Sequence, residues 1–382
     1  MKFVIPRNSF VDLVGRVSGI SPRVGIASPP LAQIRIEAKE DGSVICSATD
    51  GECEGSVTSS ADVSTPGIAL VSPKTLKPLL SSFPDGVGIE FSAEREQSTL
   101  FARLAFPCGG RISRYRVLSL DEKEWPAFSP DVEANSFAID SQMFSSLVGR
   151  VIFAAETPGS RTDLACVLIE VDDGEVRAAA TNGHLLATSS VGLDTGSVRG
   201  SFLVPLQKLN HLLRMSTRPD APIEISFTKT HARFVSGDFV FTCLLAGVVF
   251  PPYQQLLNGA AQPDEVITFD RDAAIESIGR LLPLTSAEKK PIPVRVEVTD
   301  SALNVSCQIA SEVATDEIAS NHAPLLAGRV WGGSIAYLRA ALSASPSGVC
   351  EITIPASKKA PATISGSTEN LTFFTLVAPM QL

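Results

Sequence analysis

The sequence predicts an α+β protein of three tandem similar units, each with two helices packed on antiparallel sheet. Two observations predict this fold: a strand-and-helix segment that occurs three times, and a second helix that recurs with it. The first segment covers residues 3–17, 137–151 and 267–281, at offsets of 134 and then 130 residues with no internal gap. A chain built by triplication usually forms a solenoid, a ring or a pseudo-symmetric shell.

Each copy of the first segment begins as a short strand and continues as an amphipathic helix. In the first copy the apolar residues Phe10, Leu13, Val14 and Val17 follow the i, i+3, i+4, i+7 spacing of a helix that lies on a core. The other two copies keep this spacing. A cation recurs beside the apolar stripe in all three copies: Arg16, Arg150 and Arg280.

The second recurring segment covers residues 70–80, 203–213 and 332–342 and predicts a short amphipathic helix. Its polar positions carry cations and no Asp or Glu, although the chain has a formal net charge of −9. Two interpretations stay open. The helices present solvated faces that happen to be basic, or they share one cationic surface suited to a phosphate backbone.

Alternating, β-branched stretches lie between the helices and predict strands. They cover residues 33–37, 167–171, 232–242 and 294–298. Polar stretches with Pro and Gly near Asp131 and Asn258 mark the unit boundaries. We therefore expect domains at 1–131, 132–258 and 259–382.

Composition excludes several classes of protein. Apolar residues make up 44% of the 382 residues, which indicates a globular chain, and the longest uncharged apolar run, 243–250, is too short to span a membrane. No signal peptide is evident at the N-terminus. Seven scattered cysteines without a CxxC pair indicate reduced thiols and a cytoplasmic protein. The four histidines are equally dispersed, so we expect no metal and no cofactor.

An enzyme is the first alternative class. The sequence has no G-x-S-x-G, P-loop or G-x-G-x-x-G motif and no histidine at metal-ligand spacing from an acid. The acidic pair Asp172 and Asp173 precedes Gly174 and predicts a hairpin turn. We therefore name no catalytic residue.

Five stretches are similar to a known family. They are residues 1–3 (MKF), 180–184 (ATNGH), 237–242 (GDFVFT), 250–253 (FPPY) and the C-terminal 378–382 (APMQL). In this order, on three repeats, the whole chain resembles the bacterial replicative sliding clamp, the β subunit of DNA polymerase III. The resemblance implies the DNA clamp fold and a non-catalytic processivity factor for DNA replication. It also implies a head-to-tail homodimer whose ring encircles double-stranded DNA without sequence preference.

The resemblance assigns two sets of residues. Twelve helices would line the hole of such a ring, so cations of the repeated helices and the loop after the first helix should face or border DNA. These are Arg16, Arg23, Lys74, Lys77, Arg150, Lys208, Arg214, Arg280 and Arg339. A groove would bind short hydrophobic peptides of the polymerase III alpha subunit, the clamp loader and repair polymerases. Its wall is Leu164, Thr181, Gly183, His184, Leu185, Leu186, Pro251, Gln255, Leu256, Leu376, Val377, Ala378, Pro379, Met380 and Gln381.

The groove departs from the family pattern. The family commonly has Asp where this chain has Asn182, Arg where Leu185, Gln255 and Gln381 stand, and Met where Ala378 stands. We expect weaker binding of acidic peptides. The alternative is a specialised clamp paralogue, or a partner-poor scaffold ring with an altered client range. For the dimer contact we expect residues 284–290 against the first unit's second helix and its neighbouring edge strand.

Overall fold

The computed structural model describes residues 1–22, 29–126, 128, 130, 136–159, 161, 163–216, 221–257, 265–285, 292–309, 311–346 and 348–382, without the side chains of 284 and 285. These residues form two compact units. Unit 1 contains residues 1–141 and 207–245, and unit 2 contains 142–206 and 246–382. The middle of the three predicted domains thus contributes to both units. The predicted boundaries at 131–132 and 258–259 lie outside the described residues.

Unit 1 is built on a 13-stranded antiparallel sheet in the order β10-β15-β16-β17-β4-β3-β2-β6-β9-β8-β7-β1-β5. The strands are β1 (Lys2–Pro6), β2 (Ile34–Ala38), β3 (Ser43–Thr49), β4 (Cys53–Ser60), β5 (Asp62–Thr65), β6 (Gly67–Val71), β7 (Gly88–Glu96), β8 (Thr99–Cys108), β9 (Arg111–Leu120), β10 (Ser136–Ile139), β15 (Ile223–Phe227), β16 (His231–Ser236) and β17 (Phe239–Leu244). Its helices are α1 (Arg7–Val17), α2 (Pro73–Ser82), α4 (Leu206–Met215) and the short η1 (Glu122–Glu124).

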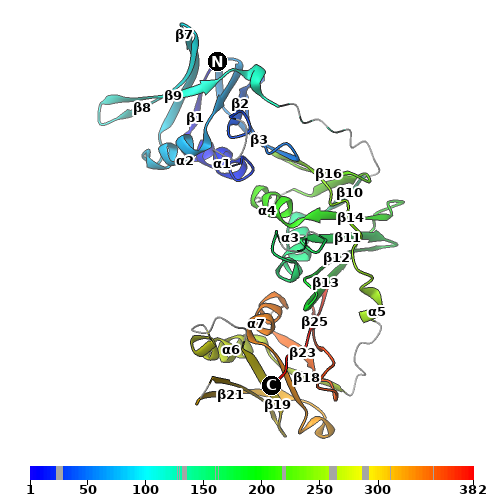
Figure 1. The fold of residues 1–382 in the computed structure, drawn as a ribbon. Helices are drawn as coiled ribbons and strands as arrows, with labels where there is room; N and C mark the ends of the chain where they lie inside the picture. The colour runs from blue at the N-terminus through cyan, green and yellow to red at the C-terminus, as the bar shows by residue number, and fades with distance from the viewer. Residues whose placement is uncertain are drawn as a thin grey trace. The chain divides into compact units, whose positions relative to one another are not determined.

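The first repeat has an aromatic core beneath α1. Phe3 of β1 stacks on Phe91 of β7 with ring centroids 5.1 Å apart, and Phe10 of α1 meets both rings edge-on at 5.9 and 5.7 Å. All three side chains are fully buried. Such pairs add about 0.5–1.5 kcal/mol each beyond the burial of apolar area. In Figure 1, α1 and α2 lie side by side against the sheet.

Unit 2 is built on a 12-stranded sheet in the order β14-β11-β12-β13-β25-β24-β23-β18-β21-β20-β19-β22. The strands are β11 (Cys166–Asp172), β12 (Glu175–Thr181), β13 (Leu185–Gly192), β14 (Gly200–Pro205), β18 (Val266–Asp270), β19 (Pro293–Val298), β20 (Ala302–Ile309), β21 (Glu312–Asn321), β22 (Val330–Ser334), β23 (Val349–Thr353), β24 (Ala362–Ser367) and β25 (Leu371–Val377). Its helices are α3 (Ser141–Gly149), α5 (Gln254–Leu257), α6 (Arg271–Thr285), α7 (Ile335–Ala344) and the short η2 (Ile152–Ala154) and η4 (Pro324–Leu326).

Both recurring segments fold as the sequence predicts. The first gives β1 and α1, β10 and α3, and β18 and α6; the second gives α2, α4 and α7, each after a strand. The hairpin turn after Asp172 is also confirmed, with Gly174 at φ 72° between β11 and β12. The strand region predicted over 232–242 is confirmed, and it forms two strands. Gly237, at φ 39°, turns the chain there, and β16 and β17 pair as a hairpin.

Each sheet runs through a junction between two successive repeats. In unit 1, β4 of the first repeat pairs with β17 of the middle repeat, and in unit 2, β13 of the middle repeat pairs with β25 of the last. The corresponding strands at the remaining ends are β9 and β21. Among described residues, β9 pairs on one side alone over 111–118, and β21 does so over 312–319. Both therefore present an open sheet edge.

The cysteines and helices of the described chain fit a simple globular protein. All seven cysteines are free thiols, and only Cys108 is exposed. None of the helices in the described ranges is both long and apolar enough to cross a membrane. Within those ranges, no group of three or more His, Cys, Asp or Glu side chains is placed to hold a metal ion.

Candidate functional site

A cavity of about 340 Å³ lies in unit 2, between the turn after β12, the segment after β17 and the end of β25. Eleven of the fifteen predicted groove residues line it: Leu164, Thr181, Gly183, His184, Leu185, Leu186, Pro251, Leu256, Leu376, Ala378 and Pro379. The other lining residues, which the sequence analysis missed, are Arg161, Pro252, Tyr253 and Pro361. The structure thus brings together residues as distant in the sequence as Arg161 and Pro379.

The floor of the cavity is apolar and tightly packed. Leu168, Ala179, Leu186, Tyr253 and Leu376 form one buried cluster. Tyr253 donates its hydroxyl hydrogen bond to Glu170. Burial and this carboxylate raise the pKa of Tyr253, so the phenol stays protonated. Of this cluster, Leu186, Tyr253 and Leu376 line the cavity, so its floor is apolar.

The rim combines an exposed apolar side chain with polar groups. Leu256 of α5 is 58% exposed although it borders the cavity. His184 is exposed and its ring stacks near that of Tyr337, with centroids 6.3 Å apart. Arg161 pairs with Asp163 at 2.9 Å. Arg161 is a cation at the rim that the sequence analysis did not name, and its charge is paired with Asp163.

The turn that carries His184 has a defined hydrogen-bond pattern. The Asn182 side-chain oxygen accepts from the backbone N–H of His184 at 2.9 Å and of Leu185 at 2.8 Å. Asp50 accepts the same two bonds in the equivalent turn of the first repeat, at 2.9 and 2.8 Å. Asn in place of Asp therefore preserves the turn, since an amide oxygen accepts as a carboxylate does.

The C-terminal segment crosses the groove wall and is held on both sides. Ala378 donates its N–H to the His184 carbonyl at 2.8 Å, and Met380 donates to the Gly332 carbonyl at 2.8 Å. A Cβ at Gly332 would approach the Met380 carbonyl oxygen to 2.7 Å, so this close passage requires glycine.

Four predicted groove residues lie elsewhere. Met380 and Gln381 line a neighbouring cavity of about 560 Å³, together with Arg295, Lys358 and Lys359. They point there because Met380 pairs with Gly332 on the other side of the segment. Val377 is fully buried between β13 and β24. Gln255 is exposed on α5 and does not line the cavity.

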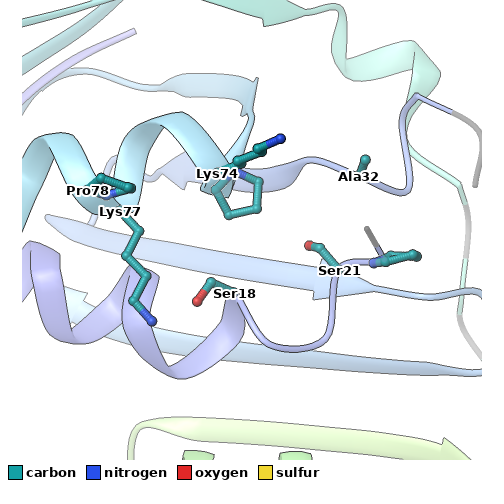
Figure 2. A pocket seen from close by; sticks show the side chains of 8 residues that line it. Ser18, Ser21, Ala32, Lys74, Lys77 and Pro78 are labelled. Atoms are coloured by element: carbon teal, nitrogen blue, oxygen red, sulfur yellow. The ribbon is translucent and has the colours of Figure 1, made fainter. Parts of the chain in front are cut away.

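The predicted DNA-facing cations divide into two groups. Lys74, Lys77, Arg214 and Arg339 are exposed on α2, α4 and α7. Lys74 and Lys77 border an open cavity of about 540 Å³ beside the end of α1, where Figure 2 shows Lys77 extending toward Ser18. Arg280 is also exposed but binds Asp316 at 2.5 Å. Arg23 lies outside the described residues.

Arg16 and Lys208 are not surface cations, which corrects the sequence expectation. Arg16 is 5% exposed and binds Asp238 at 2.6 Å. Burial opposes its charge, but the carboxylates of Asp238 and Asp12 together raise the pKa of Arg16. Lys208 is 4% exposed and bonds to Asp50. Their charges are neutralised within unit 1 because carboxylates from distant segments meet them.

Arg150 is partly buried as well. Its Nη1 donates to the Ala344 carbonyl at 2.6 Å, while its Nε is buried without a hydrogen-bond partner among the described residues. Burial lowers the pKa of Arg150, and neighbouring Arg271 adds to the effect. Arg150 therefore also departs from the expectation of a freely exposed cation.

Comparison with protein families decides where the chain belongs. Residues 1–129 match the N-terminal domain of the DNA polymerase III beta subunit, and residues 138–252 match its central domain. The chain belongs to the beta sliding clamp family. The Pseudomonas aeruginosa beta sliding clamp is 26% identical over 320 residues, which cover 83% of each chain. The clamp of Escherichia coli K12 is 25% identical over 320 residues, again 83% of each.

Solved structures of clamps share the complete fold. The DNA polymerase III subunit beta of P. aeruginosa superposes with a TM-score of 0.84 at 24% identity, covering 100% of both chains. A clamp from the same organism bound to griselimycin gives 0.87 at 23% identity, and the Caulobacter crescentus clamp gives 0.83 at 20%, both over 100% of each chain. The α+β clamp fold that the family resemblance implied is thereby confirmed.

Proposed function

We propose that this beta sliding clamp closes head to tail with a second copy into a ring around double-stranded DNA. The observation that carries this proposal is the pair of open sheet edges at β9 and β21. In unit 1 and in unit 2, the corresponding strands pair with the next repeat. A second copy supplies the missing next repeat for β21 and the missing previous repeat for β9. Two such heterologous contacts close a ring.

The two open edges are complementary in charge and in apolar surface. Strand β9 carries Arg111, Arg114 and Arg116, and β21 carries Glu312 and Glu317. Exposed apolar side chains accompany them, with Ile112 at 55%, Leu118 at 59% and Val313 at 62%. An exposed apolar strand edge without a partner invites aggregation, whereas pairing β9 with β21 would cover it. The contact expected at residues 284–290 falls largely outside the described residues.

The exposed cations support DNA binding without base recognition. Lys74, Lys77, Arg214 and Arg339 lie on the second helices, which contain no Asp or Glu. Phosphate contacts of this kind give salt-dependent affinity and carry no sequence information. A closed ring needs no tight contact, and weak contacts permit sliding.

The 340 Å³ cavity in unit 2 is the proposed site for partner peptides. A preformed apolar floor with a few polar rim groups suits short hydrophobic segments. We propose that the polymerase III alpha subunit, the clamp loader and repair polymerases bind here. The chain would act as a non-catalytic subunit in the cytoplasm, with domains at 1–131, 132–258 and 259–382.

Retention on DNA tests the ring. We expect the protein to sediment as a dimer and, once loaded, to stay on nicked circular DNA but to slide off the same DNA after linearisation. A monomer at tens of micromolar protein, or equal loss from both DNA forms, would show that the proposal is wrong.

Peptide titration tests the groove. We expect Leu256→Ser to weaken binding of a Gln-Leu-x-Leu-Phe type peptide by about fivefold, because it removes roughly 1 kcal/mol of apolar contact. Leu325→Ser is the matched control, since Leu325 is 66% exposed in η4 and lies outside the cavity. Equal affinity of both variants and the unmodified chain would rule out this cavity as the peptide site.

A further inference from the structure

The first observation is a contact between α1 and the end of α4 in unit 1. Arg16 donates from Nε at 2.9 Å and from Nη2 at 2.6 Å to the carbonyl of Met215, the last residue of α4. The last carbonyls of a helix have no partner within it and form its negative end. A guanidinium of the first repeat thus caps the second helix of the middle repeat.

The second observation repeats the first in unit 2. Arg150, just after α3, donates from Nη1 at 2.6 Å to the carbonyl of Ala344, the last residue of α7. A guanidinium of the middle repeat thus caps the second helix of the last repeat. Both junctions between successive repeats use the same contact.

The third arginine has no next repeat in its own chain. Arg280 follows Arg16 and Arg150 at the repeat offsets of 134 and 130. Its side chain is 59% exposed and binds Asp316, also within its own repeat. The helix end that corresponds to Met215 and Ala344 is Ser82, the last residue of α2. Within the described part of the chain, the Ser82 carbonyl accepts no hydrogen bond from a side chain.

The end of α2 already holds one arginine, but there is room for a second. Arg7 donates to the carbonyls of Leu80 at 3.2 Å and Ser81 at 2.9 Å, which leaves Ser82. Its counterpart in the last repeat, Arg271, donates to Ser345 at 3.0 Å while Arg150 holds Ala344. Two guanidinium groups therefore share a helix end in unit 2, and α2 can accept the same arrangement.

We propose that Arg280 caps α2 of a second copy of the chain by donating to the Ser82 carbonyl of that copy. This inference rests on the proposed head-to-tail dimer and names the contact that fixes its orientation. Asp316 stays on the same guanidinium, as Asp238 stays on Arg16 at 2.6 Å. Because the guanidinium donates to one carbonyl at a helix end, this hydrogen bond forms in one relative position of the two copies.

Cross-linking tests this proximity directly. In a Cys108→Ser background, which removes the exposed thiol, Arg280→Cys combined with Ser82→Cys is treated with a short bismaleimide. We expect a covalent dimer on a denaturing gel. Each single variant, and the pair Ser82→Cys with the exposed turn position Glu369→Cys, should give none. A dimer in sedimentation that does not cross-link through 280 and 82 would overturn the inference and leave the dimer intact.

A set of substitutions tests the energetic role. We expect Arg280→Gln to raise the dimer dissociation constant by about tenfold, because a hydrogen bond from a charged donor is stronger than one from a neutral donor. The dissociation constant of Arg280→Lys should lie between those of the unmodified chain and of Arg280→Gln. Asp316→Asn should change it by less than about twofold, because it removes an exposed ion pair within one chain. Equal effects of Arg280→Gln and Asp316→Asn would overturn the inference. If the unmodified chain stays monomeric, the proposed dimer is wrong, and so is the inference that rests on it.

Discussion

At the scale of single residues, a cation's position in a repeat does not reveal its environment. Arg16 and Arg280 hold equivalent positions, yet Arg16 is 5% exposed and the Arg280 side chain is 59% exposed. The difference comes from Asp238 and Met215, more than 190 residues away in the sequence, which enclose Arg16. Sequence could identify these arginines as a set, but not which of them the fold would bury.

The buried pair leads to a stability prediction. Asp238→Asn leaves Arg16 charged in a buried site, with Asp12, at 3.4 Å, as its one remaining carboxylate partner among the described residues. We expect a loss of about 3 kcal/mol, since breaking a buried ion pair costs more than the pair contributes. Urea unfolding followed by circular dichroism measures it. Asp173→Asn, which breaks an exposed pair with Arg199, is the control and should cost less than about 1 kcal/mol. Equal losses would show that burial does not matter here.

At the scale of elements, the sequence was most informative. Helical spacing located both helices of every repeat, because that periodicity depends on local geometry. The residues that line the groove were harder to predict from the sequence. Eleven predicted residues line it, but Met380 and Gln381 lie on the other side of the C-terminal segment, since the backbone bond from Met380 to Gly332 sets their direction. Arg161 comes from a loop with no periodic signal. A pattern of residue types does not predict such side-chain directions.

The junction of β4 and β17 predicts a pH dependence. Glu54 of β4 lies opposite Thr242 of β17, and burial raises the pKa of Glu54 to about 7 despite nearby Arg35 and Trp125. A raised carboxyl pKa means that the folded chain holds a proton that the unfolded chain has released. Below about pH 4 Glu54 is protonated in both the folded and the unfolded chain, so it does not change the free energy of unfolding. As the pH rises toward 7, Glu54 lowers the free energy of unfolding progressively, and above about pH 7 this loss is complete.

We therefore expect Glu54→Gln to stabilise the protein at pH 8 by on the order of 2 kcal/mol and to have little effect at pH 4.5. Unfolding midpoints in urea at both pH values measure the difference. Glu90→Gln, on β7 and paired with Lys2 at the surface at 3.0 Å, is the control and should show no such gain at pH 8. A stabilisation that is the same at pH 4.5 and pH 8 would contradict the assigned protonation of Glu54.

At the scale of the whole molecule, the contacts between successive repeats indicate which contacts a second copy of the chain would make. The first and middle repeats each extend their sheet into the next repeat through one strand pair, and each places one arginine at the end of the next repeat's second helix. The last repeat has the strand and the arginine but no next repeat. In the proposed dimer, β21 and Arg280 of one copy would therefore meet β9 and α2 of the other.

Charge reversal across the proposed junction gives the sharpest test of that assembly. Arg111 and Arg114 of β9 have no carboxylate partner among the described residues, and neither have Glu312 and Glu317 of β21. We expect Arg111→Glu with Arg114→Glu to convert the dimer to monomer at micromolar protein, because like charges would then face each other across the strands.

Combining that change with Glu312→Lys and Glu317→Lys should restore the dimer, since the complementarity is recovered with opposite sign. Sedimentation velocity at low and at high salt measures both steps, and added salt should lessen the defect of the first variant by screening the repulsion. Lys39→Glu with Lys229→Glu, a matched change of two exposed cations away from β9, should leave the dimer unchanged. Two outcomes would mean that β9 and β21 do not face one another. Either the second pair of substitutions fails to restore the dimer, or high salt lowers the dimer fraction of the first variant further.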